Sequence, residues 1–423
     1  MTTISFGTLK ETIRKDGLRV ISKHLPHTKK VKMSIINNTG AANDPVEHAG
    51  LAHFLEHMAF NGTSNMSRDK IASCKGRYFL NSNAFTSFCN TCYWAEVVYT
   101  HFDRMCNWLF DIYLNSVFTE DLIEKEKSII SAEIDTSLED MPRQNFFQLT
   151  NLFLVGDHPM KRSVLGTRES IQTIDHDLLL KTRDSWHVSK NTTILCVGKV
   201  DHDEMMGKVN DFFPFNPQEA PKLIYEDSSR DFQTNRAIIE RSGRKDSIVS
   251  YACRVPVTFD DHQLHVLTHL NGCLGGNSDS ILFKEIRRER GLAYSVDSYL
   301  WKRFPALGFW LVITAKVSPE NLKEVEKALL QVACESKISK DLFKRKQAIN
   351  LDRARVFLED INEWENYLFS ELITSDKDIV YLSDPVDRII KEINKVTYEE
   401  VVELKEQLLS PERLACAIVK STD

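Results

Sequence analysis

Runs of apolar, β-branched and aromatic residues predict four strands in the first half of the chain. They are expected at residues 17–22, 31–36, 84–96 and 193–200, the third as a strand or a hairpin. Apolar residues at helical spacing predict helices at 102–114 and 174–186. The pattern therefore indicates a mixed fold of strands and helices.

A further short helix is predicted between two sets of boundary signals. Asp44 is the expected N-cap, Pro45 suits the first helical position, and Glu47 follows three residues after the cap. Asn61-Gly62 is the expected stop. The apolar face of this helix would consist of Leu51, Phe54, Leu55 and Met58.

This helix carries a candidate metal site. His53 and His57 are four residues apart, so both can point at one ion, and Glu56 lies beside them. Two neutral imidazoles with a nearby carboxylate favour zinc or a similar ion over magnesium or calcium. The alternative is a surface helix that carries two histidines by chance, so the site needs a third ligand from elsewhere.

A second helix with unusual polar positions is expected at 120–134, with Thr119 as its N-cap. Its predicted inward stripe is Leu122, Glu126, Ile129 and Glu133. A buried carboxylate without a partner costs several kcal/mol, so both glutamates would need partners. In the alternative, the stripe is rotated and both glutamates are solvated; the periodicity favours neither.

The second half of the chain repeats the first half faintly. Residues 213–222 hold three prolines and are expected to be a linker. An offset of 222 matches 174–177 with 396–399 and 194–197 with 416–419 in character. An offset of 213 places Leu51 on Leu264 but replaces His53, Glu56 and His57 by Val266, His269 and Leu270. The second half would then keep the helix and lack the metal site.

Composition narrows the class of protein. A chain of 423 residues with 42% hydrophobic residues suggests two to three domains. The net charge of −6 and the absence of a basic run argue against a nucleic-acid partner. No apolar run is long enough to span a bilayer.

The sequence also favours an intracellular location. Residues 1–9 contain no signal-peptide core, and the next residues mix acidic with basic side chains. Nine cysteines without regular spacing fit reduced thiols better than a disulfide framework.

Three further features have competing interpretations. His262, His265 and His269 share a helix face, but without a carboxylate or cysteine at matching spacing a polar face explains them better than a second metal site. Cys89 and Cys92 would point to opposite faces of a strand, which favours buried thiols over a metal or redox pair. Residues 119–141 hold eight acidic residues and two lysines; this is usually a solvated face, although it would also attract basic peptides.

The interval from His57 to Glu133 resembles a spacing found in a known family. The order His-x-x-Glu-His followed by Glu at this distance is similar to the inverzincin pattern of the insulinase and pitrilysin family of zinc peptidases. Residues 50–63 resemble the short-chain branch that includes the mitochondrial processing peptidase β subunit and bacterial relatives. Other segments follow in the family's order: an active-site edge strand at 83–86, a loop at 165–171, and a substrate clamp at 282–287 and 290–296.

The resemblance implies a role for each matching residue. One Zn²⁺ per chain would be bound by His53, His57 and Glu133, with Glu56 as general base and Glu126 as a supporting carboxylate. Substrate contacts would come from Asn83, Ala84, Arg287 and Tyr294. The chemistry is sensible, because three protein ligands leave zinc a position for water, whose proton a nearby carboxylate can accept. An arginine or tyrosine could stabilise the developing oxyanion.

Two departures from the family pattern leave the subunit arrangement and the substrate open. Residues 41–44 lack the usual charged run, and the glycine-rich loop of the family's noncatalytic subunit is represented only by Gly275-Gly276.

We therefore predict an α+β fold of two similar halves, residues 1–212 and 223–423, each an antiparallel sheet with helices on one face. The family resemblance implies that the halves form a clam-like chamber. The expected function is a zinc metalloendopeptidase acting on short or unfolded peptides, with presequence processing as one form. The alternative is a noncatalytic core subunit of a larger complex. A homodimer or a heterodimer with a related subunit is expected, in the cytoplasm or in a mitochondrial or other organelle matrix.

Overall fold

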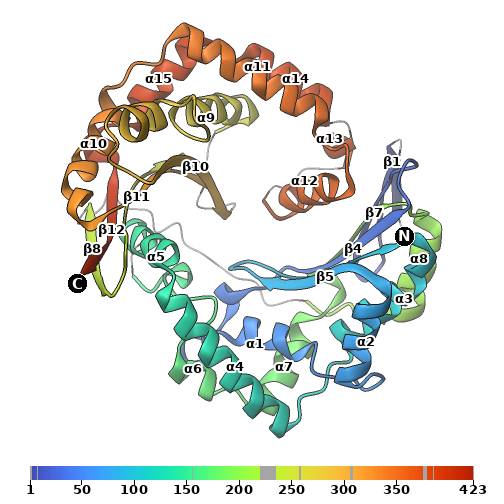
Figure 1. Cartoon of the computed structure of the whole chain (residues 1–423). Helices are drawn as coiled ribbons and strands as arrows, with labels where there is room; N and C mark the ends of the chain where they lie inside the picture. Colours follow the sequence, from blue (N-terminus) through green and yellow to red (C-terminus); the bar gives the residue numbers. More distant parts are fainter. Residues whose placement is uncertain are drawn as a thin grey trace. The chain divides into compact units, whose positions relative to one another are not determined.

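The computed structural model forms two compact units, each assembled from three separate stretches of the chain (Figure 1). Unit 1 comprises Met1–Asp135, Arg162–Ile224 and Leu358–Pro385, and unit 2 comprises Thr136–Lys161, Tyr225–Phe357 and Val386–Asp423. The described residues are 2–6, 8–154, 156–219, 235–256, 259–304, 308–374, 379–383 and 385–422. Each unit contains a sheet packed with helices, which confirms the predicted α+β class.

The described part of unit 1 contains a seven-stranded sheet of order β1-β2-β3-β7-β4-β6-β5. Its strands are β1 (Thr2–Phe6), β2 (Leu9–Ile13), β3 (Arg19–His24), β4 (Lys30–Asn37), β5 (Phe79–Thr86), β6 (Thr91–Val98) and β7 (Thr192–Gly198). Its helices are α1 (Leu51–Met58), α2 (Arg68–Tyr78), α3 (Phe102–Leu114), α6 (Arg168–Gln172), α7 (His176–Trp186), α8 (His202–Phe212), α12 (Ile361–Thr374) and α13 (Ile379–Ser383). Helix α4 (Glu120–Glu139) begins in unit 1 and ends in unit 2. Neighbouring strands are antiparallel except for the parallel pair β3 and β7.

The described part of unit 2 contains a five-stranded sheet of order β10-β11-β9-β12-β8. Its strands are β8 (Arg236–Ser242), β9 (Ser247–Val255), β10 (Ser295–Phe304), β11 (Gly308–Val317) and β12 (Ala415–Thr422). Its helices are α5 (Met141–Phe153), α9 (Asp261–Leu274), α10 (Leu322–Glu335), α11 (Lys340–Val356), α14 (Pro385–Lys395) and α15 (Tyr398–Leu408), with a π-helix at Phe283–Glu289. Here too one pair of strands, β8 and β12, is parallel.

The elements expected from the apolar pattern of the first half are confirmed. The four predicted strands correspond to β3, β4, the β5–β6 hairpin and β7. The two predicted helices correspond to α3 and α7. No helix in the described ranges combines the length and the apolarity that a membrane crossing requires.

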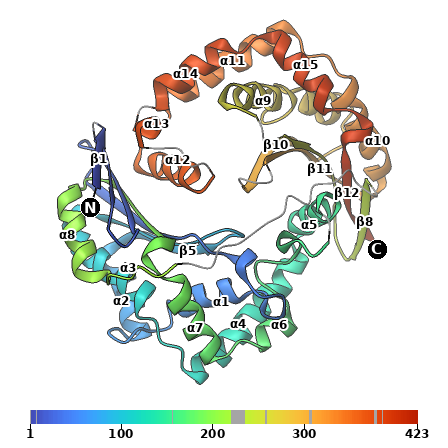
Figure 2. The same ribbon diagram turned by 180° about the vertical axis from the view of Figure 1, so that it is seen from behind.

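The sheet of unit 1 is covered on both faces (Figure 2). Successive side chains of a strand point to opposite faces, and in β4 Val31, Met33 and Ile35 belong to the core that contains α3. The alternate residues Lys32 and Ser34 point to the other face and bond Glu365 of α12. Helices were predicted on one face; α12 adds a layer on the second.

Unit 2 repeats this two-sided arrangement. Cys416 and Ile418 of β12 belong to the core that contains α9, α10 and α15. Ala415 and Ala417 face the other way, where they pack with Leu149 of α5. Helix α12, from the C-terminal half of the sequence, thus covers the sheet of unit 1, and helix α5, from the N-terminal half, covers the sheet of unit 2.

The structure agrees with the repeat detected in the sequence. An offset of 222 carries α7 onto α15 and places β7 on β12, and an offset of 213 carries α1 into α9. The division into 1–212 and 223–423 stays a prediction, since it concerns the repeated halves rather than the interleaved compact units. Of the predicted linker 213–222, residues 220–222 lie outside the described ranges.

A buried ion pair anchors the start of that segment to the β2–β3 turn. Arg14 donates from Nη2 to Asp16 Oδ2 at 2.6 Å and also hydrogen-bonds the carbonyl oxygens of Phe213 and Pro214. Burial raises the pKa of the Asp16 carboxyl, but hydrogen bonds from Arg14, Ser189 and the backbone of Asn216 outweigh burial and hold this pKa well below its usual range. Residues 213–216 are thus tied to the N-terminal hairpin.

This shift predicts a pH-dependent stability difference. A carboxyl with a depressed folded-state pKa stabilises the protein above its unfolded-state pKa of about 3.9, and this contribution is lost as the pH falls through the folded-state value. Asp16→Asn should therefore lower the free energy of unfolding by about 2–3 kcal/mol at pH 7, with the gap to wild type narrowing below about pH 4. Urea unfolding at pH 7 and pH 3 measures the gap. An equal gap at both values would contradict this account.

Candidate metal centre

The helix that carries both histidines begins later than the sequence predicts. Two 3₁₀ turns, Ala41–Asn43 and Val46–His48, precede it, and the N-cap is Gly50 rather than Asp44. Gly50 has a φ of 95°, a left-handed conformation that favours glycine. The Asp44 carboxylate nevertheless accepts hydrogen bonds from the backbone N–H groups of Gly50 and Ala52, at 2.8 and 2.9 Å. Asp44 therefore secures the first turn of α1 from a distance.

Three candidate ligand atoms converge beside α1. The Nε2 atoms of His53 and His57 are 3.2 Å apart. Oε2 of Glu133, on α4, lies 3.8 Å from Nε2 of His53 and 3.6 Å from Nε2 of His57. Tetrahedral zinc with bonds of about 2.0–2.1 Å holds its ligand atoms about 3.3 Å apart. The observed spacings therefore fit a zinc ion, and this is the group of potential metal ligands found among the described residues.

Glu126 fixes the orientation and tautomer of His57. Its Oε1 lies 2.8 Å from Nδ1 of His57, and its Oε2 accepts a 2.8 Å hydrogen bond from Asn61. The Nδ1 proton of His57 is thereby engaged, which leaves an Nε2 lone pair facing His53. Burial raises the pKa of Glu126, but the hydrogen bonds with His57 and Asn61 outweigh it and hold that pKa below its usual value. Burial lowers the pKa of His57, but Glu126 and the neighbouring carboxylates raise it overall.

The Glu56 carboxylate is buried next to the convergent atoms. The Thr86 hydroxyl, at the end of β5, donates a 2.7 Å hydrogen bond to Oε2 of Glu56. Burial raises the pKa of Glu56 to about 6, against the opposing effects of Thr86 and His57. A carboxylate whose pKa lies near neutrality is suited to exchange protons during a reaction.

Strand β5 brings Asn83 and Ala84 to the edge of the sheet. These residues pair with Trp94 and Tyr93 of β6, and β5 is the last strand in the order of the sheet. Ala84 is buried, whereas Asn83 is exposed on the opposite face. The strand that carries the Thr86 contact to Glu56 thus has one side without a neighbouring strand in the described structure.

The inward stripe predicted for α4 is partly wrong. The buried side chains of this helix are Ile123, Glu126, Lys127, Ile130 and Ile134. Ile129 is exposed, and Glu133 lies at the edge of the stripe with its side chain 42% exposed. The apolar surface under α4 selects a face rotated by about one residue from the predicted one, so Glu126 is buried and Glu133 reaches the histidines from the rim.

Arg287 and Tyr294 belong to unit 2. Arg287 lies on the π-helix, with its guanidinium 4.9 Å from the centre of the Phe283 ring. Tyr294 is 60% exposed, and its backbone N–H donates to Lys316 O. Their predicted contact with substrate stays a prediction.

Two histidines of α9 form hydrogen bonds within unit 2. Nε2 of His262 bonds Glu400 at 2.9 Å, and Nδ1 of His269 lies 2.8 Å from the His265 carbonyl oxygen. Neither belongs to a potential metal group in the described residues. Neither Cys89 nor Cys92 forms a disulfide in the described part of the chain, and Cys92 is buried.

Two side chains that hydrogen-bond the carboxylates of the site, Asn61 and Thr86, were not predicted from the sequence. Asn61 follows His57 by four residues, a spacing at which a short polar side chain can reach back towards a helix. Thr86 shares a strand face with Ala84. The sequence contains both of these spacings, but neither identifies the carboxylate that the side chain bonds.

Two family models match consecutive parts of the chain. The model described as insulinase (peptidase family M16) matches residues 19–168. The model described as peptidase M16 inactive domain matches residues 173–350. The first match contains all of the convergent ligand residues, and the second contains Arg287 and Tyr294.

Curated relatives match almost the whole chain. An uncharacterized zinc protease of Mycobacterium leprae is 29% identical over 422 residues, covering 96% of this chain and 90% of the relative. An uncharacterized zinc protease of Bacillus subtilis is 27% identical over 419 residues, covering 97% and 98%.

Solved structures share the fold. A protease from Helicobacter pylori superimposes with a TM-score of 0.84 at 19% identity, covering 97% of this chain and 99% of that one. A structure from Pseudomonas fluorescens, described as a peptidase M16 inactive domain, gives 0.85 at 15% identity, with 98% of each chain covered.

Proposed function

Because this chain belongs to the insulinase family (peptidase family M16), we propose that it is a zinc endopeptidase that hydrolyses short or unfolded peptides. One observation carries the proposal. The imidazole nitrogens of His53 and His57 and the Glu133 carboxylate converge at zinc-ligand spacing beside the buried Glu56 carboxylate. The choice of short or unfolded peptides as substrate, and any role in presequence processing, are proposed from the family resemblance.

The proposed chemistry assigns a task to each residue. Zinc held by His53, His57 and Glu133 would supply Lewis acidity that activates water and polarises a peptide carbonyl. Glu56 accepts the proton of the attacking water. The hydrogen bond from the Thr86 hydroxyl to Oε2 of Glu56 holds this carboxylate in place.

The open edge of β5 is the proposed site for the peptide backbone. An extended peptide can add to a sheet edge through main-chain hydrogen bonds, which read the backbone before the side chains. Asn83 and Ala84 lie on this strand. Arg287 and Tyr294 are proposed to contact the substrate carbonyl from unit 2, by their resemblance to the family's clamp.

The second candidate is a noncatalytic core subunit of a larger complex. The intact donor set, with the Glu56 carboxylate buried beside it, favours the enzyme. For both the peptidase and the core subunit, the family resemblance leads us to propose a homodimer or a heterodimer with a related subunit.

The decisive experiment compares wild type with Glu56→Gln, using a quenched basic peptide and metal analysis. Loss of the general base should lower hydrolysis by about 10²–10⁴-fold. Zinc content should stay at the wild-type level, because Glu56 is not one of the three proposed ligands.

Glu47→Gln is the matched control, because it removes an exposed carboxylate from the turn before α1. Its activity and zinc content should equal those of wild type. Wild-type protein without zinc, or undiminished hydrolysis by Glu56→Gln, would refute the peptidase.

A further inference from the structure

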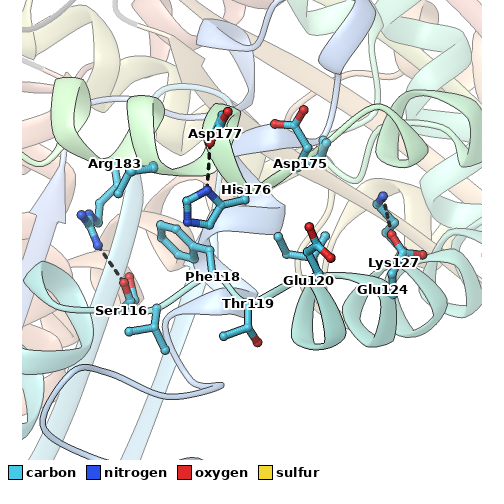
Figure 3. A pocket seen from close by; sticks show the side chains of 14 residues that line it. Ser116, Phe118, Thr119, Glu120, Glu124, Lys127, Asp175, His176, Asp177 and Arg183 are labelled. Carbon is cyan, nitrogen blue, oxygen red and sulfur yellow. Dashed lines mark hydrogen bonds and ion pairs between the residues drawn. The ribbon is translucent and has the colours of Figure 1, made fainter.

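A cavity of about 850 Å³ lies between the beginnings of α4 and α7 in unit 1 (Figure 3). Its lining contains Phe118 and Glu120 on one side and Asp175 and His176 on the other. None of the proposed metal ligands, nor Glu56, lines this cavity. It is therefore a separate feature of the unit that carries the metal centre.

The cavity combines an apolar base with an acidic rim. Phe118, Ile123 and Ile174 are 4%, 3% and 0% exposed, and all three line it. Glu120 and Asp175 are exposed at its margin. A ligand that fits must therefore bring both an apolar portion and a polar or charged group.

The two cations that line the cavity already have partners. Lys127 Nζ lies 2.8 Å from Glu124, and Arg183 pairs with Asp184 at 2.9 Å while donating to the Ser116 carbonyl oxygen at 2.7 Å. No ion pair joins a cation to Glu120 or Asp175 within the described ranges. Four carboxylates line the cavity against these two cations, so the remaining charge is negative.

Helix capping explains only part of this arrangement. Asp175 accepts a hydrogen bond from the Leu178 N–H, and Glu120 lies in the first turn of α4, where the helix dipole favours a carboxylate. These roles account for acidic residues at each helix separately. Capping does not explain why the acidic first turns of two helices line the same cavity, which has an apolar base.

We propose that this cavity binds a basic peptide segment, with a lysine or arginine as its main contact. The aliphatic stem of such a side chain would pack against Val117 and Leu180, which are only partly buried in the lining, and its cationic head would approach Glu120 and Asp175. A cavity of this size accommodates a few residues. The acidic character expected for residues 119–141 thereby acquires a specific location at the beginning of α4.

The proposal does not rest on the peptidase function, so its test measures binding. A fluorescent peptide of alternating lysine and leucine, carrying a photo-crosslinking group, is added to the full-length Glu56→Gln protein. Cross-links should map to residues 116–127 or 174–183. Replacing the lysines by glutamate, or raising the salt concentration, should remove these cross-links, because exposed charge interactions are screened.

Charge reversal within one helical turn provides the matched pair of variants. Glu120→Lys should weaken peptide binding at least about fivefold. Asp121→Lys, at the adjacent exposed position outside the lining, should change binding less than about twofold. Circular dichroism checks that both variants are folded, and cleavage of a short neutral peptide by the same variants in the wild-type background should be unchanged.

Three results would overturn the proposal. These are cross-links confined to other parts of the chain, equal weakening by Glu120→Lys and Asp121→Lys, or equal binding of the glutamate peptide. None of them would bear on Glu56-dependent hydrolysis, which is measured separately.

Discussion

Glu133→Gln is expected to bind zinc at least about 100-fold more weakly than wild type and to lose peptide hydrolysis. The carboxylate approaches Nε2 of both His53 and His57 to within 3.8 Å, and a neutral amide is a much poorer ligand for zinc than a carboxylate. Two histidines alone would leave the ion with half of its usual tetrahedral set. Competition with a zinc chelator, followed by metal analysis, measures the affinity.

Two further variants on the same helix provide an intermediate and an unchanged zinc affinity for comparison. Glu126→Gln keeps all three ligands but weakens the bond that orients His57, so zinc affinity should fall only about 10- to 100-fold. Glu124→Gln removes a carboxylate that is 66% exposed and should leave zinc affinity unchanged. Wild-type affinity in the Glu133→Gln protein would show that the third ligand lies elsewhere.

Removing the Glu365 carboxylate is expected to destabilise the protein by about 3–5 kcal/mol. Glu365 lies 3.1 Å from Lys32 Nζ, and both side chains are 7% exposed. Glu365 also accepts a 2.7 Å hydrogen bond from the Ser34 hydroxyl. In Glu365→Ala the Lys32 ammonium would keep its bond to Asn362 and its position over the Trp94 ring but lose its counter-charge.

Unfolding in urea, followed by tryptophan fluorescence, measures the loss, because the Trp94 ring lies against the Lys32 ammonium. Asn366→Ala, at an exposed position of α12, should have a small effect. The double variant Lys32→Met with Glu365→Leu should recover most of the stability, because apolar replacement of both partners leaves no unpaired buried charge. A loss below about 1 kcal/mol in Glu365→Ala would place this pair in the class of weak surface ion pairs.

These contacts show which parts of the fold the sequence determines locally. Helix α3 and the strands follow from periodicity, because alternate or helical spacing already defines which side chains share a face. The geometry of His53 and His57 follows from the same helical spacing. Glu133 could be assigned only by resemblance, since no local rule joins positions so far apart in the sequence.

Other features depend on distant partners and could not be predicted. Lys32 and Ser34 alternate with apolar residues in β4, a pattern typical of a solvated face, yet α12, from the last part of the chain, covers them. The predicted buried face of α4 differs from the observed one by about one position for a related reason. The periodicity of the helix is compatible with a small rotation about its axis, and packing against the core determines which face is buried. The start of α1 was misplaced because two 3₁₀ turns intervene where Pro45 suggested a helix.

The exchange of covering helices has a consequence for synthesis of the protein. Strand β4 is complete at residue 37, but α12 ends only at residue 374. At translation rates of about 5–20 residues per second, on the order of 20–70 s separate the two. During that interval the β4 face that bears Lys32 and Ser34 lacks its cover on the ribosome. The sheet beside the metal centre therefore acquires its final packing late in translation or after it, even though most of its strands are made early.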